Sequence, residues 1–129
     1  MPKVFRLSEQ YLIRAEARAN QKNYSGASKD LSDLRRARFQ GGNGSISVSE
    51  QNWLEIIEEE RVRELYMEGF RLQDLKRWHK GFERKPQEQS LTNGSSLKIE
   101  ADDERFVWPI PKHELESPGS QIQPNESNK

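Results

Sequence analysis

The chain has 129 residues, of which 32% are hydrophobic and 33% charged, so it makes one domain or a piece of one. Its 21 basic and 21 acidic side chains give a formal net charge of zero, which argues against a general nucleic-acid binder, and no apolar run is long enough to span a membrane. The absence of cysteine excludes disulfides, thiolate nucleophiles and cysteine-based metal sites.

Residues 1–40 predict a helical hairpin. The first helix runs from about Ser8, the expected N-cap, to Gln21, and the second runs from Ser25 to the stop signal at Gly41–Gly42. Each helix carries an apolar stripe at helical spacing. The stripes consist of Tyr11, Leu12, Ala15 and Ala19 in the first helix and of Ala27, Leu31 and Leu34 in the second. The small alanines allow the two helices to approach closely.

The hairpin resembles one tetratricopeptide (TPR) unit. With Ala27 placed at the alanine of the repeat's second helix, Tyr11 and Ala15 fall at the aromatic and small positions of its first helix. Tyr24 then falls at the aromatic position of the turn. The alternative is a generic helical hairpin, and both interpretations stay open. A single repeat cannot bury its own faces, because such units normally need about three neighbours.

Residues 47–81 predict a second helix pair. The sequence Ser47–Glu50 is typical of a capping box, and the helix that follows should run to about Glu68. Its inward-facing residues are expected to be Trp53, Leu54, Ile57 and Leu65. Gly69 interrupts the pattern, and a fourth helix is expected from about Phe70 to Lys80.

Residues 82–129 predict an irregular polar segment. Lys85–Pro86 and Asn93–Gly94 are turn signals, residues 97–99 should be briefly extended, and residues 112–115 should form one helical turn. The prolines in Phe106–Pro111 disfavour helix and favour an extended strap across the helices, while the end from Ser117 should fray. The expected fold class is therefore all-α: a TPR-like hairpin packed on a second helix pair, with an extended Pro-rich C-terminal strap.

Four motifs occur in the order and spacing of a known family. Glu60–Trp78 reads ER-x-x-EL-x-x-EG-x-R-x-x-DL-x-RW, and Trp108–Leu115 reads WPIPKHEL. Arg6–Leu12 followed by Arg14–Ala17 is similar to R-x-x-E-x-YL-x-x-AEA, and Asn23–Arg35 is similar to the helix that follows it in the same family. On these motifs the chain, from Arg6 to Leu115, resembles the C-terminal portion of SusD/RagB family proteins.

The resemblance implies a surface-exposed outer-membrane lipoprotein of the Bacteroidetes type. Such proteins bind glycans for polysaccharide uptake, cover a SusC-type TonB-dependent transporter, use no cofactor and are not enzymes. Full-length relatives are several times longer and begin with a lipoprotein signal and its lipidated cysteine, neither of which is present here. We therefore expect residues 1–129 to be the C-terminal region alone. Such a piece is expected to expose apolar surface and to self-associate.

Two other functions compete with that interpretation. A free-standing TPR-like module would bind a protein partner through its groove, and a small enzyme is the third interpretation. Neighbouring carboxylates at Glu58–Glu60 point in different directions on a helix, whereas glycosidases need two facing each other across about 5–10 Å. His79 and His113 show no metal-ligand spacing, so neither a metal site nor a catalytic residue is predicted.

A partly buried ion-pair network is predicted around the helices. In the main hypothesis, Arg61 or Arg71 reaches a carboxylate of the first helix, such as Glu9 or Glu16. The predicted members of the network are Arg6, Glu9, Glu16, Arg61, Glu64, Arg71 and Asp74.

The tryptophans are the candidates for sugar contact, since a flat aromatic ring can cover the apolar face of a pyranose. Trp53 and Trp78 lie at inward helical spacing, and core packing is favoured for both. Trp108 lies beside Pro109 and is the weak candidate for carbohydrate binding, although packing is favoured there as well.

Overall fold

The computed structural model describes residues 6–39, 41, 44–85 and 97–128. The chain divides into two compact units, Met1–Phe70 and Arg71–Lys129, and each is described by itself. The described part is mainly helical, with one two-stranded sheet, so the predicted all-α class is confirmed. No helix within the described residues has both the length and the apolar character needed to cross a membrane.

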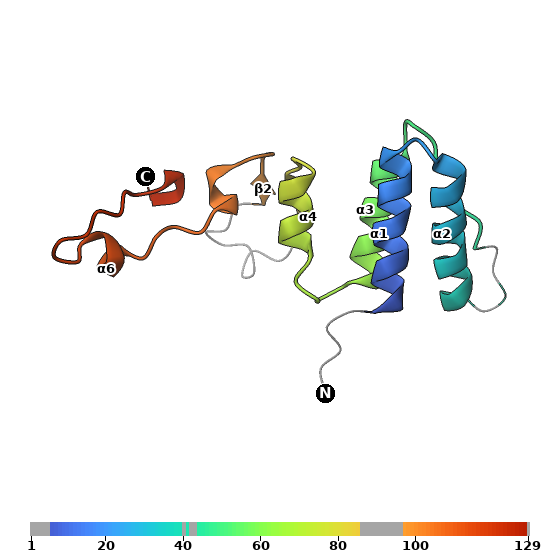
Figure 1. Ribbon diagram of the computed structural model, residues 1–129, viewed down its shortest axis with the longest axis horizontal. Helices are drawn as coiled ribbons and strands as arrows, with labels where there is room; N and C mark the ends of the chain where they lie inside the picture. The colour runs from blue at the N-terminus through green and yellow to red at the C-terminus, as the bar shows by residue number, and fades with distance from the viewer. Residues whose placement is uncertain (1–5, 40, 42–43, 86–96, 129) are drawn as a thin grey trace. The chain divides into compact units, whose positions relative to one another are not determined.

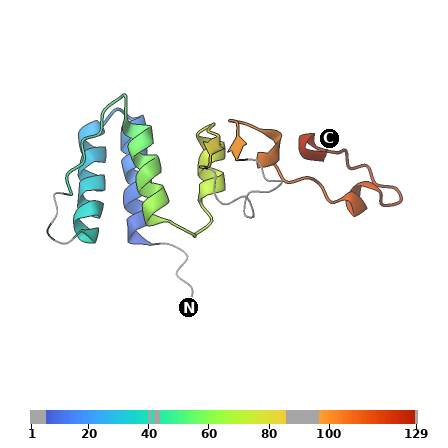
Figure 2. The same ribbon diagram turned by 180° about the vertical axis from the view of Figure 1, so that it is seen from behind.

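The first unit is built from three helices. These are α1 (Leu7–Asn20), α2 (Tyr24–Arg38) and α3 (Trp53–Glu64), and α1 is in contact with both others (Figures 1 and 2). Leu12, Leu31 and Ile57 contribute one fully buried side chain from each helix. Ala15 and Ala27 are also fully buried, and their small side chains permit the close approach of α1 and α2. Assignment of this hairpin to the TPR type stays a prediction.

The short turn between α1 and α2 is fixed by local hydrogen bonds. Lys22 adopts a left-handed φ of 61°, and the Asn23 N–H donates to the Arg18 carbonyl at 2.8 Å. The Asn23 side chain then accepts from the Gly26 N–H at 2.9 Å and caps α2. At the other end of α1 the predicted N-cap is wrong, because Arg6 is the cap residue and Ser8 lies buried within the helix.

The segment before α3 is attached to α2 through two serine side chains. The backbone N–H of Ile46 donates to Ser32 Oγ and that of Val48 donates to Ser28 Oγ, each at 2.9 Å. Both apolar side chains are buried, so this segment completes the core of the first unit.

Both predicted ends of the third helix are corrected by the structure. Asn52 is the N-cap, and its side chain accepts from the Ser49 N–H at 2.7 Å, so the predicted capping box at 47–50 lies before the helix. The helix ends at Glu64 rather than near Glu68, because Met67 and Gly69 adopt positive φ angles of 63° and 82° that no right-handed helix contains.

The second unit contains short elements. They are α4 (Arg71–Arg77), β1 (Phe82–Glu83), β2 (Lys98–Ile99), η1 (Glu104–Phe106), α6 (Lys112–Leu115) and η2 (Glu126–Asn128). The strands pair antiparallel, with Phe82 opposite Ile99. Only glycine fits at position 81, where a Cβ would lie 2.1 Å from the Ile99 carbonyl oxygen. Leu75 and Phe106 are the buried apolar side chains among the residues described in this unit.

Predictions for the second unit are corrected in two places. The fourth helix is shorter than predicted and gives way to a left-handed His79 with φ 52°. Residues 126–128, predicted to fray, form η2, and side chains at 125, 127 and 128 contact the strap. The expected helical turn at 112–115 and extended segment at 97–99 correspond to α6 and β2. The turns predicted at Pro86 and Asn93–Gly94 lie outside the described residues.

Candidate functional site

Three carboxylates between the helices of the first unit bind arginines from neighbouring elements. They are Asp30 on α2 and Glu60 and Glu64 on α3, and we call this arrangement the arginine–carboxylate seam. The Asp30 side chain is 1% exposed and those of Glu60 and Glu64 are 7% and 10% exposed. Carboxylates buried to this degree are stable only when charged donors replace the water they lose.

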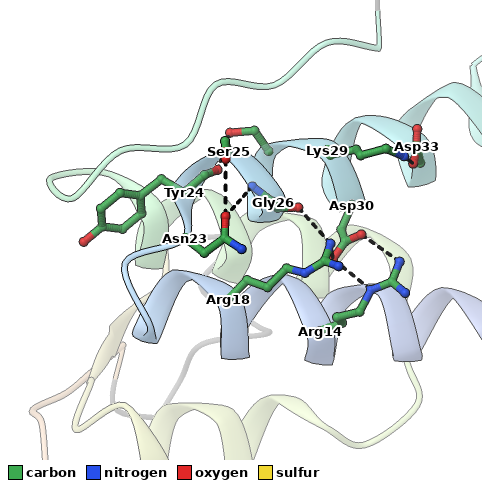
Figure 3. Close-up of polar contacts among 10 residues, drawn as sticks. Arg14, Arg18, Asn23, Tyr24, Ser25, Gly26, Lys29, Asp30 and Asp33 are labelled. Carbon is green, nitrogen blue, oxygen red and sulfur yellow. Dashed lines mark hydrogen bonds and ion pairs between the residues drawn. The ribbon is translucent and has the colours of Figure 1, made fainter.

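Asp30 is held by two arginines from α1. Figure 3 shows both guanidinium groups pointing toward its carboxylate. Arg14 binds bidentately, with Nε–Oδ2 and Nη2–Oδ1 distances of 3.0 and 2.8 Å, and Arg18 Nη1 donates to Oδ2 at 2.7 Å. The hydrogen bond and charge of Asp30 raise the pKa of Arg14. Because Arg14 and Arg18 lie four residues apart, one face of α1 presents both to α2.

Glu60 joins α2 to α3. Its Oε1 accepts from Arg35 Nε at 2.9 Å, with a further short contact to Arg35 Nη2, and from Arg63 Nη1 at 2.7 Å. Arg63 also reaches Glu59 at 2.7 Å, and hydrogen bonding to that carboxylate raises the pKa of Arg63.

Glu64 joins the start of α1 and the end of α2 to α3. Arg38 Nε donates to its Oε2 at 2.9 Å, and Arg6 donates to Oε1 at 3.1 Å and to its backbone carbonyl at 2.7 Å. The Arg38 hydrogen bond, together with the charges of Arg38 and Arg6, lowers the pKa of Glu64 to about 2. Arg6 also binds Glu68 at 2.6 Å.

Of the predicted network, the structure brings Arg6 and Glu64 together. Glu9 is buried in α1 and Glu16 is half-buried, while the buried Arg61 lies with its guanidinium 5.9 Å from the Phe70 ring. The hypothesis that Arg61 reaches Glu9 or Glu16 stays a prediction.

The two remaining predicted members belong to the second unit. Asp74 is buried and binds Arg77 at 3.0 Å, and Arg71 lines a cavity described below. Whether Arg71 pairs with a carboxylate of α1 also stays a prediction.

The sequence interpretation missed Asp30, together with the pairing of Glu60 with Arg35. One signal was available for Asp30: it lies three residues after Ala27 and directly before Leu31, on the apolar face of its helix. A charged residue on such a face requires a partner, and Arg14 and Arg18 stand at the edge of the facing stripe.

The tryptophans divide into two kinds. Trp53 and Trp78 are each half-buried within their own unit, and the Arg77 guanidinium lies 4.3 Å from the Trp78 ring. Trp108 is 81% exposed, so the interpretation that packing covers it is wrong in this structure. The cause is the extended strap, whose flanking Pro109 and Val107 are also exposed.

The backbone around Trp108 is held in place by the end of the chain. Asn125 Nδ2 donates to the Trp108 carbonyl at 2.8 Å, and Ser127 Oγ donates to the Val107 carbonyl at 2.5 Å. Asn128 accepts from the Ile110 N–H at 3.0 Å and donates to its carbonyl at 2.9 Å. These bonds fix the strap and leave the indole ring available to a ligand.

No metal centre is evident in the parts of the chain that the structure describes, where no three acidic or histidine side chains gather. His79 Nδ1 lies 2.8 Å from an Asp102 oxygen in an exposed pair.

The SusD family matches the chain over residues 2–126, which is nearly its whole length. The chain therefore belongs to the SusD family. Family membership supports a role in glycan binding for nutrient uptake, since SusD-family proteins bind carbohydrate and are not catalytic. Neither the curated proteins nor the solved structures provide a significant match.

Proposed function

We propose that this chain is part of a surface-exposed outer-membrane protein that captures glycans and delivers them to a SusC-type TonB-dependent transporter. The observation that carries the proposal is the family match, which spans both compact units. In this proposal the protein is anchored to the outer membrane by a lipid and carries out no chemistry on the glycan.

The first unit acts as the support in this proposal. Its seam ties α1, α2 and α3 through charged hydrogen bonds that require specific geometry, whereas apolar packing alone tolerates sliding. A support of this kind keeps the surfaces of the first unit itself in fixed positions.

Trp108 is the proposed sugar contact of the second unit. Its ring is exposed while its backbone carbonyl is bound by Asn125, so the backbone that carries the ring is already ordered before a sugar stacks on it. An indole ring also presents a wide apolar face with a polar N–H at one edge, which suits a pyranose.

Calorimetric titration of this chain with a panel of neutral oligosaccharides tests the glycan contact. We expect weak saturable binding that Trp108→Ala abolishes. Tyr66→Ala is the matched control, since it removes a 75% exposed aromatic ring from the other unit. Absence of binding to any glycan, or equal loss in both variants, would contradict the proposed contact.

The partnership with a transporter needs a separate experiment. The tagged chain should retain a SusC-type transporter from detergent-solubilised outer membranes of the bacterium that produces the chain. Retention of no transporter would overturn the partnership and leave the glycan contact standing. Release of reducing sugar by the pure chain would instead establish an enzyme.

A second candidate function is protein binding by a TPR-like module. It is favoured by the outer face of α1, where Leu7 is 74% and Ile13 is 45% exposed beside a shallow cavity of about 330 Å³. The same face accounts for the expected self-association. If Ile13→Ser converts a self-associating chain to a monomer, this face is the contact, and an unchanged oligomeric state would contradict it.

A further inference from the structure

The second unit contains a cavity of about 320 Å³ that the glycan proposal does not use. It is lined by Arg71, Leu72, Leu75, Phe82, Arg84 and Phe106. Four of these residues are apolar, two carry guanidinium groups and none is acidic. Ligand pockets typically have volumes of about 300–1,000 Å³, so the cavity is large enough for a small organic molecule.

The walls of the cavity are fixed by neighbouring secondary structure. Leu75 and Phe106 are 2% and 5% exposed, and Asp103 caps the short η1 helix by accepting from the Arg105 N–H at 2.9 Å. The Arg84 N–H donates to the Leu97 carbonyl at 2.8 Å, which continues the β1–β2 pairing. A ligand would therefore enter a site that is already formed.

Arg84 provides the charge that selects the ligand. Its guanidinium lies 5.4 Å from the Phe82 ring, and no carboxylate of the described residues pairs with it. A guanidinium prefers a carboxylate with two parallel hydrogen bonds, which this arginine can still make. Arg71 contributes a second positive group to the wall.

The apolar walls restrict the rest of the ligand. A sugar ring placed against Leu72, Leu75 and Phe106 would lose water from its hydroxyl groups without gaining protein partners. A bare inorganic anion would leave the apolar surface uncovered. An aromatic ring on a short acidic chain satisfies both the walls and the arginine.

We propose that the cavity of the second unit binds a small carboxylate that carries an aromatic ring on a short chain, with its ring against Phe82 and Phe106 and its carboxylate on Arg84. This inference does not rest on the glycan function, because it involves neither Trp108 nor the first unit.

Titration of the whole chain with 3-phenylpropionate, followed by NMR chemical shifts or calorimetry, tests the proposal. We expect saturable binding that weakens about tenfold or more with 3-phenylpropionamide, which keeps the ring and lacks the charge. Propionate, which lacks the ring, should also bind about tenfold or more weakly than 3-phenylpropionate. These comparisons use the unmodified protein, so they do not depend on a variant that folds.

Arg84→Gln should weaken 3-phenylpropionate binding about tenfold, and Arg84→Lys should restore part of it. Lys112→Gln is the matched control, because it removes one charge from an exposed lysine of the same unit outside the cavity. No saturable binding, equal affinity for the amide, or equal loss with Lys112→Gln would overturn the proposal. Binding of short peptides with a C-terminal phenylalanine about tenfold more tightly than 3-phenylpropionate would also overturn it, by assigning the cavity to a protein C-terminus.

Discussion

The two compact units of this chain are stabilised in different ways. The described part of the first contains ten buried apolar residues, on or beside three helices, and three carboxylates that are at most 10% exposed between those helices and have arginine partners. The second contains two buried apolar residues among those described, and side chains such as Asn125 and Asn128 bind the backbone of its strap. Regular helices can share a core and a charged seam, whereas short irregular elements rely on hydrogen bonds near the surface. We therefore expect the first unit to be the more resistant to local unfolding.

The largest effect is expected from removing core volume in the first unit. Leu31→Ala removes a fully buried side chain and should lower the free energy of unfolding by about 2–5 kcal/mol, measured in urea. Leu75→Ala is the counterpart in the second unit, and its effect should concentrate on amides after Arg71 in hydrogen exchange. Equal loss of protection along the whole chain in both variants would show that the units unfold together.

The next largest effect is expected at Asp30. Asp30→Ala leaves Arg14 and Arg18 without their common acceptor and should cost about 3 kcal/mol of unfolding free energy. Breaking a buried pair typically costs about 3–5 kcal/mol, and the lower value is expected here because both arginines are partly exposed and regain water. Asp33→Ala, which breaks the Lys29 and Arg36 pairs on the outer side of the same helix, should lower the free energy of unfolding much less. Similar losses for the two variants would contradict a special role for the buried carboxylate.

A smaller effect is expected at the cap of α2. Asn23→Ala removes the acceptor of the Gly26 N–H and should lower the unfolding free energy by about 1 kcal/mol in the same urea assay. Ser25→Ala, which deletes only a 3.3 Å contact to the Asn23 side chain, is the control and should be nearly neutral. A neutral Asn23→Ala would mean that packing alone fixes the start of the helix.

The smallest expected effect is the pH dependence of stability that Glu64 causes. The pKa of Glu64 falls from its ordinary value of 4.5 to about 2 in the folded chain, chiefly through Arg38. A depressed folded pKa adds stability above the ordinary value, and that stability is lost as pH falls from about 4.5 to about 2. Exposure of Arg38 and Arg6 to solvent screens part of the effect. The stability difference between the natural chain and Glu64→Gln should therefore shrink across this window, and a constant difference would contradict the assignment.

The sequence predicted the positions of the main helices because apolar spacing and glycine stops are local signals. It also placed Ala15 and Ala27 on the facing sides of α1 and α2, where both are buried. The start of α3 was misplaced because Ser47–Glu50 matches a capping box, whereas Asn52 occupies the N-cap position and its side chain accepts from the Ser49 N–H before the helix.

The site was less predictable because its contacts depend on the relative rotation of helices. Periodicity places Asp30 on a buried face but does not select Arg14 and Arg18 over the other arginines of the chain. The exposure of Trp108 depends on hydrogen bonds from Asn125 and Ser127, which are 17 and 19 residues later in the sequence. Local patterns contain no information on such pairings.

Hydrogen exchange of the whole chain, with and without Asp30→Asn, most directly tests whether the seam holds the first unit as a rigid support. We expect slow exchange in α1, α2 and α3 of the natural chain, and a loss of protection in all three helices of the variant. Amides of β1, β2 and η1 should exchange faster than these helices in the natural chain and should not change in the variant. Unchanged protection of the three helices in Asp30→Asn would contradict the account.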